Sequence, residues 1–244
     1  MAQSKELSAS RDPPPHSGGS ICLGSPDGVL KGGLALSELH EFTPAGPTHH
    51  GAVLGFALGL AALSPSQEGA IVFVQQDFAA LEGAALYGLG GAPFGIDPER
   101  FLLVRAATPK DALWAMEEAL KTRGITAVIG ELAERGETAD LTATRRLSLA
   151  AQKGGSLALL LRQYAWREPI AAATRWQIAA ASGASDEFGG LGATAFSLTL
   201  TKNRRGPCGT WILQWDHHAK RFFPALPRAV AQPAVDGPAG AAVA

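Results

Sequence analysis

The segment from Glu38 to Leu63 constrains the fold most, because it joins a strand pattern, a turn-rich loop and a helix pattern without interruption. Leu36 to Phe42 reads as a short strand. The loop from Thr43 to Gly51 is rich in proline and glycine, and Ala52 to Leu63 is long enough for about three helical turns. A strand, a glycine-containing loop and a helix in this order form the layout of a phosphate-binding loop.

The two loop glycines also have the spacing of a phosphate loop. Gly46 and Gly51 are separated as in the motif G-x-x-x-x-G-K-[ST], but Ala52 replaces the lysine and Val53 replaces the serine or threonine. The lysine would contact the β- and γ-phosphates, and the hydroxyl would coordinate Mg²⁺. Losing two charge-assisted contacts of about 1.5–3 kcal/mol each weakens binding by about 10²–10⁴-fold. We therefore expect the frame of a nucleotide site without its binding groups, and no bound cofactor.

Composition limits the class of protein. The chain has 244 residues, 46% of them hydrophobic and 18% charged, with a net charge of −1, which indicates one substantial globular domain. This charge balance gives no electrostatic basis for general nucleic-acid binding. Cys22 and Cys208 are far apart in the sequence, so neither a disulfide framework nor a cysteine metal site is expected, and a reducing compartment is favoured.

The ends of the chain differ from its middle. Residues 1–33 are rich in serine, proline and glycine, and residues 224–244 are almost wholly alanine, proline, valine and glycine, so both are expected to be disordered. The folded domain is predicted to span residues 34–223. The N-terminus has no secretory signal pattern, and the apolar segment Ala52 to Leu63 is too short to cross a bilayer, so we expect a cytoplasmic location without membrane contact.

Within the predicted domain, apolar strand patterns alternate with helix patterns. This alternation predicts an α/β fold with a mostly parallel sheet and helices on both of its faces. After residue 170 the strand patterns follow one another without helices, which predicts an antiparallel extension of the sheet at the C-terminal end. The expected strands are Ala70–Val74, Phe101–Arg105, Ala127–Leu132, Ser156–Leu161, Thr174–Ala180, Phe196–Lys202 and Thr210–Asp216, and the expected helices after the loop are Phe78–Leu89, Pro109–Thr122 and Leu141–Lys153.

Several short stretches, taken in order, resemble the core of the RecA recombinases. Within that superfamily the chain is most similar to the ImuA family, bacterial proteins of inducible, error-prone translesion synthesis. The resemblance covers about residues 34–220. Each stretch alone is weak evidence for it, but the order and spacing of the stretches are specific. The stretches are Leu39–Phe42, Phe94–Arg105, Asp111–Glu118, Ala127–Leu132, Asp140–Leu147, Thr174–Trp176 and Trp211–His217.

The resemblance implies a RecA-like core, and it allows the recombinase positions to be compared with this chain. Asp77 stands where the recombinase has its catalytic glutamate, but its side chain is one methylene shorter and is expected to hold a water less well. Gly130 and Glu131 stand where a strand should end in a Mg²⁺-binding aspartate. Gln163 matches a nucleotide-sensing glutamine. The segments that match the two DNA-binding loops of the recombinase are short in this chain.

The resemblance implies a non-catalytic accessory protein in SOS-induced DNA damage tolerance, acting by protein–protein interaction. Its implied partners are an ImuB-like homologue of the Y-family polymerases, an error-prone DNA polymerase III alpha-type subunit and RecA itself. Two alternatives belong to other classes. One is a weak DNA-stimulated ATPase that uses Asp77 and Glu131, and the other is a cell-division inhibitor similar to SulA.

Two basic clusters are candidates for contact with DNA or a partner. Arg145 and Arg146 lie near the start of a predicted helix, where an interaction surface and a simple charged helix face are both consistent with the sequence. Lys202, Arg204 and Arg205 form a basic turn, which is either a contact site or a solvated hairpin tip. By resemblance, Lys202 and Arg204 fall where recombinase lysines reach the nucleotide of a neighbouring subunit.

The adjacent pair His49 and His50 is the remaining feature of the loop that bears on ligand binding. Adjacent side chains on a loop rarely converge on one ion, and no third ligand follows in a readable spacing. We therefore predict no metal site.

Overall fold

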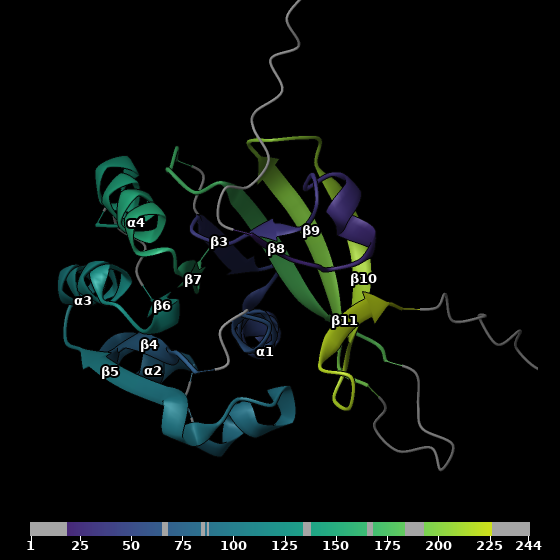
Figure 1. Cartoon of the computed structure of the whole chain (residues 1–244), viewed down its shortest axis with the longest axis horizontal. Helices are drawn as coiled ribbons and strands as arrows, with labels where there is room; N and C mark the ends of the chain where they lie inside the picture. Colours follow the sequence, from purple (N-terminus) through teal and green to yellow (C-terminus); the bar gives the residue numbers. More distant parts are fainter. Residues whose placement is uncertain are drawn as a thin grey trace, which may run out of the picture.

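A nine-stranded sheet forms the centre of the protein (Figure 1). The computed structural model describes residues 19–64, 68–83, 86, 88–133, 138–164, 168–183 and 193–225. The strands are β1 Ser20–Ile21, β2 Leu34–Ala35, β3 Leu39–Pro44, β4 Ala70–Gln76, β5 Phe101–Ala106, β6 Ile125–Leu132, β7 Leu157–Arg162, β8 Thr174–Ala181, β9 Ala195–Asn203, β10 Gly209–Asp216 and β11 Arg221–Pro224. The α-helices are α1 His50–Ala62, α2 Asp77–Gly83, α3 Pro109–Lys121 and α4 Leu141–Gly154, and the 3₁₀ turns are η1 Ser25–Gly28, η2 Pro47–His49, η3 Gly88–Phe94 and η4 Pro98–Arg100.

The strand order confirms the predicted α/β architecture. The order across the large sheet is β11-β10-β9-β8-β3-β7-β6-β4-β5. Neighbouring strands from β8 to β5 pair in parallel. The pairs β8–β9, β9–β10 and β10–β11 are antiparallel, so the C-terminal strands extend one edge of a parallel sheet. The inner parallel strands β4, β6 and β7 are buried on both faces, which explains their continuous apolar runs.

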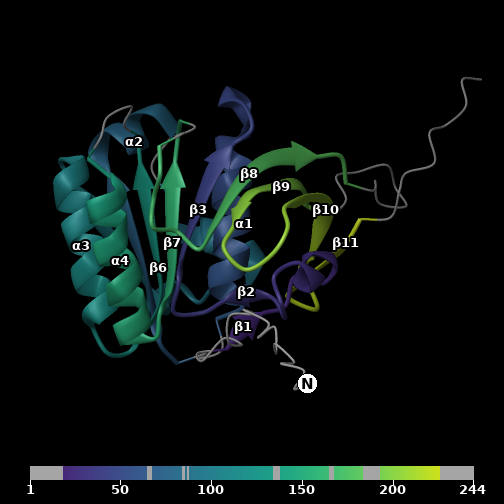
Figure 2. The same ribbon diagram turned by 90° about the horizontal axis from the view of Figure 1, so that it is seen from above.

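Helices cover both faces of this sheet, as expected. Helices α3 and α4 pack side by side on one face, and α1 lies on the other face inside the curl of strands β8 to β11 (Figure 2). Thr108 caps α3 by accepting a hydrogen bond from the Asp111 amide at 3.2 Å. No helix within the described ranges is both long and apolar enough to cross a membrane.

The alanine- and glycine-rich composition of α1 follows from its central position. The helix is apolar on all sides because it contacts the parallel strands on one side and aromatic rings of the extension on the other. A Cβ atom at Gly59 would lie 2.6 Å from the ring of Phe222 in β11, and one at Gly55 would lie 3.3 Å from the ring of Phe94. The glycines therefore let aromatic rings approach the helix backbone closely.

The predicted disordered N-terminal arm is wrong for residues 19–33. Strand β1 of this segment pairs with β2 at Leu34–Ala35, and Ile21, Leu23 and Leu30 are buried in the core. Asn203 of β9 donates a hydrogen bond to the carbonyl of Val29 at 2.9 Å. The few apolar residues of this segment are enough to order it, because the antiparallel extension of the sheet provides the surface that they cover. Residues 1–18 and 226–244, the remainder of the two predicted disordered ends, lie outside the described residues.

Three predicted element boundaries also need correction. Strand β3 begins at Leu39 and not at Leu36, because Ser37 adopts a positive φ of 59° in a turn. The helix predicted over Phe78–Leu89 is described only as α2 to Gly83, followed by the 3₁₀ turn η3. The sheet includes Pro224, which was placed in the tail, because β11 pairs with β10 through Leu213.

Candidate functional site

The loop that resembles a phosphate loop connects β3 to α1. Its Ala45 amide donates to the carbonyl of Ile178 at 2.9 Å, and the ring nitrogen Nδ1 of His49 accepts from the Ala180 amide at 3.2 Å. Both contacts tie the loop to β8. Residues Pro47–His49 form a single 3₁₀ turn that leads directly into α1. Gly46 has extended backbone geometry, which any residue can adopt.

The two positions that follow the loop glycines face apolar surroundings. Val53 is 3% exposed and belongs to the core cluster on the α1 face. Ala52 lines a hollow of about 360 Å³ together with Gly51, Gly55, Phe94 and Phe196. The described lining of this hollow contains no charged side chain. A triphosphate placed at this hollow would therefore meet no cation from its walls.

Asp77 directly follows strand β4 and pairs with an arginine near the end of the neighbouring strand β5. It begins α2, and its carboxylate is half exposed and pairs with Arg105 of β5, whose Nη2 lies 2.9 Å away. Arg105 Nε donates to the same oxygen at 3.0 Å. Asp77 therefore pairs towards β5, on one side of β4, whereas Glu131 belongs to β6, on the other side of β4. Use of the two carboxylates in a weak nucleotide site stays a prediction.

Glu131 instead belongs to a buried polar cluster with two glutamines. Gln75 of β4 donates from Nε2 to Glu131 Oε2 at 2.8 Å, and the two residues are register partners. Gln163, at the end of β7, donates from Nε2 to the carbonyl of Ala79 in α2 at 3.0 Å. Burial raises the pKa of Glu131, although hydrogen bonds from Gln75 and Gln163 oppose the shift. The cluster joins three parallel strands to α2.

Packing against α3 explains why a glycine stands at residue 130, where the resemblance would place a Mg²⁺-binding aspartate. A Cβ atom at Gly130 would lie 2.0 Å from the sulfur of Met116 in α3. The side of β6 that carries Gly130 is therefore filled by α3, whereas Glu131 points to the opposite side, under α2. Any side chain at residue 130 would have to displace Met116.

The cluster gives a prediction about pH. Because the folded-state pKa of Glu131 is raised, its contribution to stability is fully present below the unfolded-state pKa of about 4.3 and is lost as pH rises through the folded-state pKa. Glu131→Gln removes the ionisation and places an amide near the Gln163 oxygen, which has no hydrogen-bond donor among the described residues. We expect the variant to gain stability over the wild type as pH rises from 4 to 8, measured by urea unfolding at each pH. A difference that is constant across this range would contradict the assignment.

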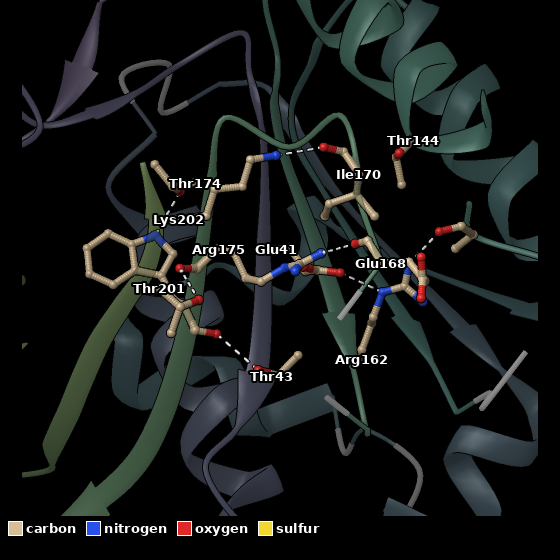
Figure 3. A network of polar contacts seen from close by, with 12 residues as sticks. Glu41, Thr43, Thr144, Arg162, Glu168, Ile170, Thr174, Arg175, Thr201 and Lys202 are labelled. Atoms are coloured by element: carbon tan, nitrogen blue, oxygen red, sulfur yellow. Dashed lines mark hydrogen bonds and ion pairs between the residues drawn. The ribbon is translucent and has the colours of Figure 1, made fainter. Parts of the chain in front are cut away.

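A buried ion-pair network lies on the opposite face of the sheet, on strands β3, β7 and β8 (Figure 3). Glu41 of β3 is fully buried and pairs with two arginines, Arg162 of β7 and Arg175 of β8. Arg162 Nε lies 2.6 Å from Glu41 Oε1 and is 1% exposed. Its Nη2 donates to the carbonyl of Ala139, and Arg175 Nη2 donates to the carbonyl of Glu168 at 3.0 Å. The network therefore connects three neighbouring strands to the segments that follow β6 and β7.

The basic turn after β9 is largely engaged within the protein. Lys202 donates to the carbonyl of Ile170 at 2.7 Å, and burial together with the nearby charges of Arg204 and Arg175 lowers its pKa. Arg205 pairs with Glu38 just before β3. Arg204 is exposed, so it is the member of the turn whose side chain faces solvent. Lys202 and Arg205 thus have partners within the protein, and contact of Lys202, Arg204 and Arg205 with DNA or a partner stays a prediction.

The second basic pair lies on α4, whose N-terminus is capped by Asp140 through the Ala143 amide at 2.7 Å. Arg145 and Arg146 are both exposed. Arg146 Nη2 lies 2.6 Å from a carboxylate oxygen of Glu117 in α3, so it bridges the two helices. Their role in binding a partner stays a prediction.

The histidine pair is not part of a metal cluster. His49 is held by β8 as described, and burial lowers the pKa of His50, opposed by the charge of Glu82. Among the residues that the structure describes, no group of three or more histidine, cysteine, aspartate or glutamate side chains could hold a metal ion.

Sequence reasoning missed the two buried polar assemblies. The signal for the network was Glu41, the single acid of its strand, and for the cluster it was the pair Gln75 and Gln76 at the end of β4. A buried charge or amide in such a position requires a partner on a neighbouring strand. The sequence does not say which strand is the neighbour, because that depends on strand order.

The strand order and the position of the loop before α1 define a RecA-like core with an antiparallel C-terminal extension. No protein-family model matches the chain. Two curated relatives, both called Protein ImuA, come from Caulobacter vibrioides strains NA1000 and ATCC 19089. Each is 34% identical to the chain over 211 residues, which is 80% of the chain and 82% of the relative. The chain belongs to the ImuA family.

Proposed function

We propose that the protein is a non-catalytic, RecA-like accessory factor in SOS-induced DNA damage tolerance, which acts in error-prone translesion synthesis by binding a polymerase-related partner. Membership of the ImuA family supports a role in inducible mutagenesis. The partners that fit this role are an ImuB-like homologue of the Y-family polymerases, an error-prone DNA polymerase III alpha-type subunit and RecA. The protein would act in the cytoplasm.

The observation that carries the non-catalytic part of the proposal is the environment of Ala52 and Val53. The first lines an apolar hollow and the second is in the core, so neither position offers a cation or a hydroxyl to a Mg²⁺-bound triphosphate. Asp77 is occupied by Arg105, and Glu131 is buried beneath α2. We therefore regard Gly46, Gly51, Ala52 and Val53, with Asp77 and Glu131, as a vestigial nucleotide site.

The experiment that tests the proposal is a capture assay with purified proteins of the host. The tagged full-length chain is mixed separately with the ImuB-like protein, the alpha-type polymerase subunit and RecA, and a replicative polymerase subunit serves as the control. We expect stable capture of the ImuB-like protein and no capture of the control. Failure to capture any of the three candidates would overturn the proposed function.

A further inference from the structure

Strand β5 is one of the two outer strands of the nine-stranded sheet (Figure 1). Along one edge it pairs with β4 in an unbroken parallel register from Phe101 to Ala106, and no strand of the described chain pairs with its other edge. Backbone N–H and C=O groups of a strand point alternately to its two sides. Those on the outer side of β5 are therefore open to a further strand.

Exposed apolar side chains gather at this open edge. Leu102 and Leu103 of β5 are 55% and 40% exposed, and they point to opposite faces of the sheet because side chains alternate along a strand. Phe78 and Leu81 of α2, the helix whose first residue pairs with Arg105 of β5, are 49% and 82% exposed. These four are half of the eight large apolar side chains that are exposed in the described chain, so the edge has the character of an interaction surface.

The edge also lacks the features that keep edge strands from pairing. Such strands are ordinarily blocked by charged side chains, prolines or bulges. Strand β5 contains no proline, and its register with β4 is regular. Its single charged residue is Arg105, which is paired with Asp77. The other outer strand, β11, is shorter, begins with Arg221 and ends with Pro224, so β5 is the edge that is open to strand addition.

The occupant that this edge specifies is an extended, apolar segment of another protein. Outward backbone groups of an edge strand are satisfied by a further strand. Because the charges of Arg105 and Asp77 cancel, neither an acidic nor a basic segment is favoured, whereas the exposed leucines favour apolar side chains. The described chain begins beside the extension, where Asn203 binds Val29, and it ends in β11, eight strand spacings or roughly 38 Å from β5. Neither end is near this edge.

We propose that the open edge of β5 is a docking site for an extended apolar segment of the partner protein, which adds to the sheet as a tenth strand. The backbone of the segment hydrogen-bonds with β5, and its apolar side chains pack against Leu102 on one face and Leu103 on the other. This assignment rests on the proposed function, because it names the surface through which an accessory protein holds its partner.

Hydrogen–deuterium exchange of the full-length chain, read over residues 101–106, tests the edge. The probe is an eight-residue peptide of alternating valine and threonine, N-methylated along one edge so that it cannot form fibrils. The control peptide has the same sequence and is N-methylated at every residue, so it has no edge left for pairing. We expect the probe to slow exchange over residues 101–106 in a saturable way, without an effect on β11, and the control peptide to slow neither strand.

Three exchange results would overturn the proposal. They are an unchanged exchange rate over residues 101–106 with the probe, equal slowing in β5 and β11, and equal slowing by the two peptides. Slowing over residues 101–106 that grows with protein concentration alone would identify a second copy as the occupant and would also overturn it.

A pair of matched variants tests the edge with the ImuB-like protein. Leu102→Lys with Leu103→Lys places a charge on each face of β5, and it is expected to weaken capture by about tenfold or more because edge charges oppose strand addition. Leu141→Lys with Leu149→Lys makes the same change on α4, where the two leucines are 51% and 56% exposed, and it should capture as the wild type does. Equal unfolding midpoints show that the variants are folded.

The same variants separate this proposal from the proposed function. If the wild type captures the ImuB-like protein and Leu102→Lys with Leu103→Lys captures it equally well, the edge assignment is wrong and the proposed function stands. If the wild type captures no candidate but the probe slows exchange over residues 101–106 alone, the edge accepts a strand and the proposed function fails.

Discussion

Replacing Glu41 with leucine is expected to lower the free energy of unfolding by about 3–5 kcal/mol. The substitution leaves Arg162 in the core without the carboxylate that faces its Nε at 2.6 Å, and it also removes the ion-pair partner of Arg175. A buried charge that loses its counter-ion is among the most destabilising of single changes, because the desolvation cost remains when the attraction is gone. The loss is measured by urea unfolding of the purified variant at neutral pH.

Two further variants serve as comparisons for this prediction. Glu117→Gln removes an ion pair whose arginine, Arg146, is 62% exposed, so it should cost less than about 1 kcal/mol. The double variant Glu41→Leu with Arg162→Met removes both buried charges, and it should be more stable than Glu41→Leu alone. If Glu41→Leu and Glu117→Gln cost the same, Glu41 is not the counter-ion of a buried network.

Phe56→Ala is expected to cost a similar amount, about 3–5 kcal/mol, for a different reason. Phe56 of α1 is fully buried, and its ring centroid lies 5.8 Å from that of Phe42, 5.6 Å from Phe196 and 4.9 Å from Phe222. These rings belong to the parallel part of the sheet and to its antiparallel extension. Truncation therefore leaves a cavity at the point where α1 holds the two parts together. Thermal or urea unfolding measures the effect.

The comparison for this variant is Phe78→Ala in α2, where the ring is 49% exposed. That substitution should change stability by no more than about 0.5 kcal/mol. A small effect of Phe56→Ala, comparable to that of Phe78→Ala, would mean that the extension does not depend on α1 for its position.

Much of the fold follows from the sequence because periodicity is local. The apolar runs at Ala70–Val74 and Ala127–Leu132 predict buried parallel strands, and each is part of an observed strand, β4 or β6. Trp176 and Trp215, which lie within two of the expected strands, are fully buried. These features depend on which side chains are buried. The pattern of apolar residues over a short stretch of sequence predicts that burial.

The rest depends on contacts between distant segments, which a single sequence does not specify. The N-terminal residues 19–33 look too polar to fold, but Asn203 and the other residues of the extension provide a surface for them 170 residues or more away in the chain. Lys202 and Arg205 look like a free basic turn until their partners, Ile170 and Glu38, are known. The sequence alone therefore predicts least well the roles of polar residues near turns and strand ends.

The residues that we propose as a vestigial site also combine features that the sequence shows with features that depend on distant contacts. The replacements Ala52 and Val53 are plain in the sequence, whereas the role of Gly130 depends on α3, because Met116 fills the space that a side chain would need. Pairing of Asp77 with Arg105 likewise requires β5 to be the neighbour of β4. The sequence shows these residue types, but it does not show which residues they contact.

The most direct test of a non-catalytic accessory role is to compare capture of the ImuB-like partner with and without millimolar ATP and Mg²⁺. If the phosphate loop is vestigial, the apparent affinity of the full-length chain for this partner is the same in both conditions, and Asp77→Ala leaves it unchanged. Capture that requires ATP and Mg²⁺, and that is lost in Asp77→Ala, would contradict the account and would show that the site still binds nucleotide despite Ala52 and Val53.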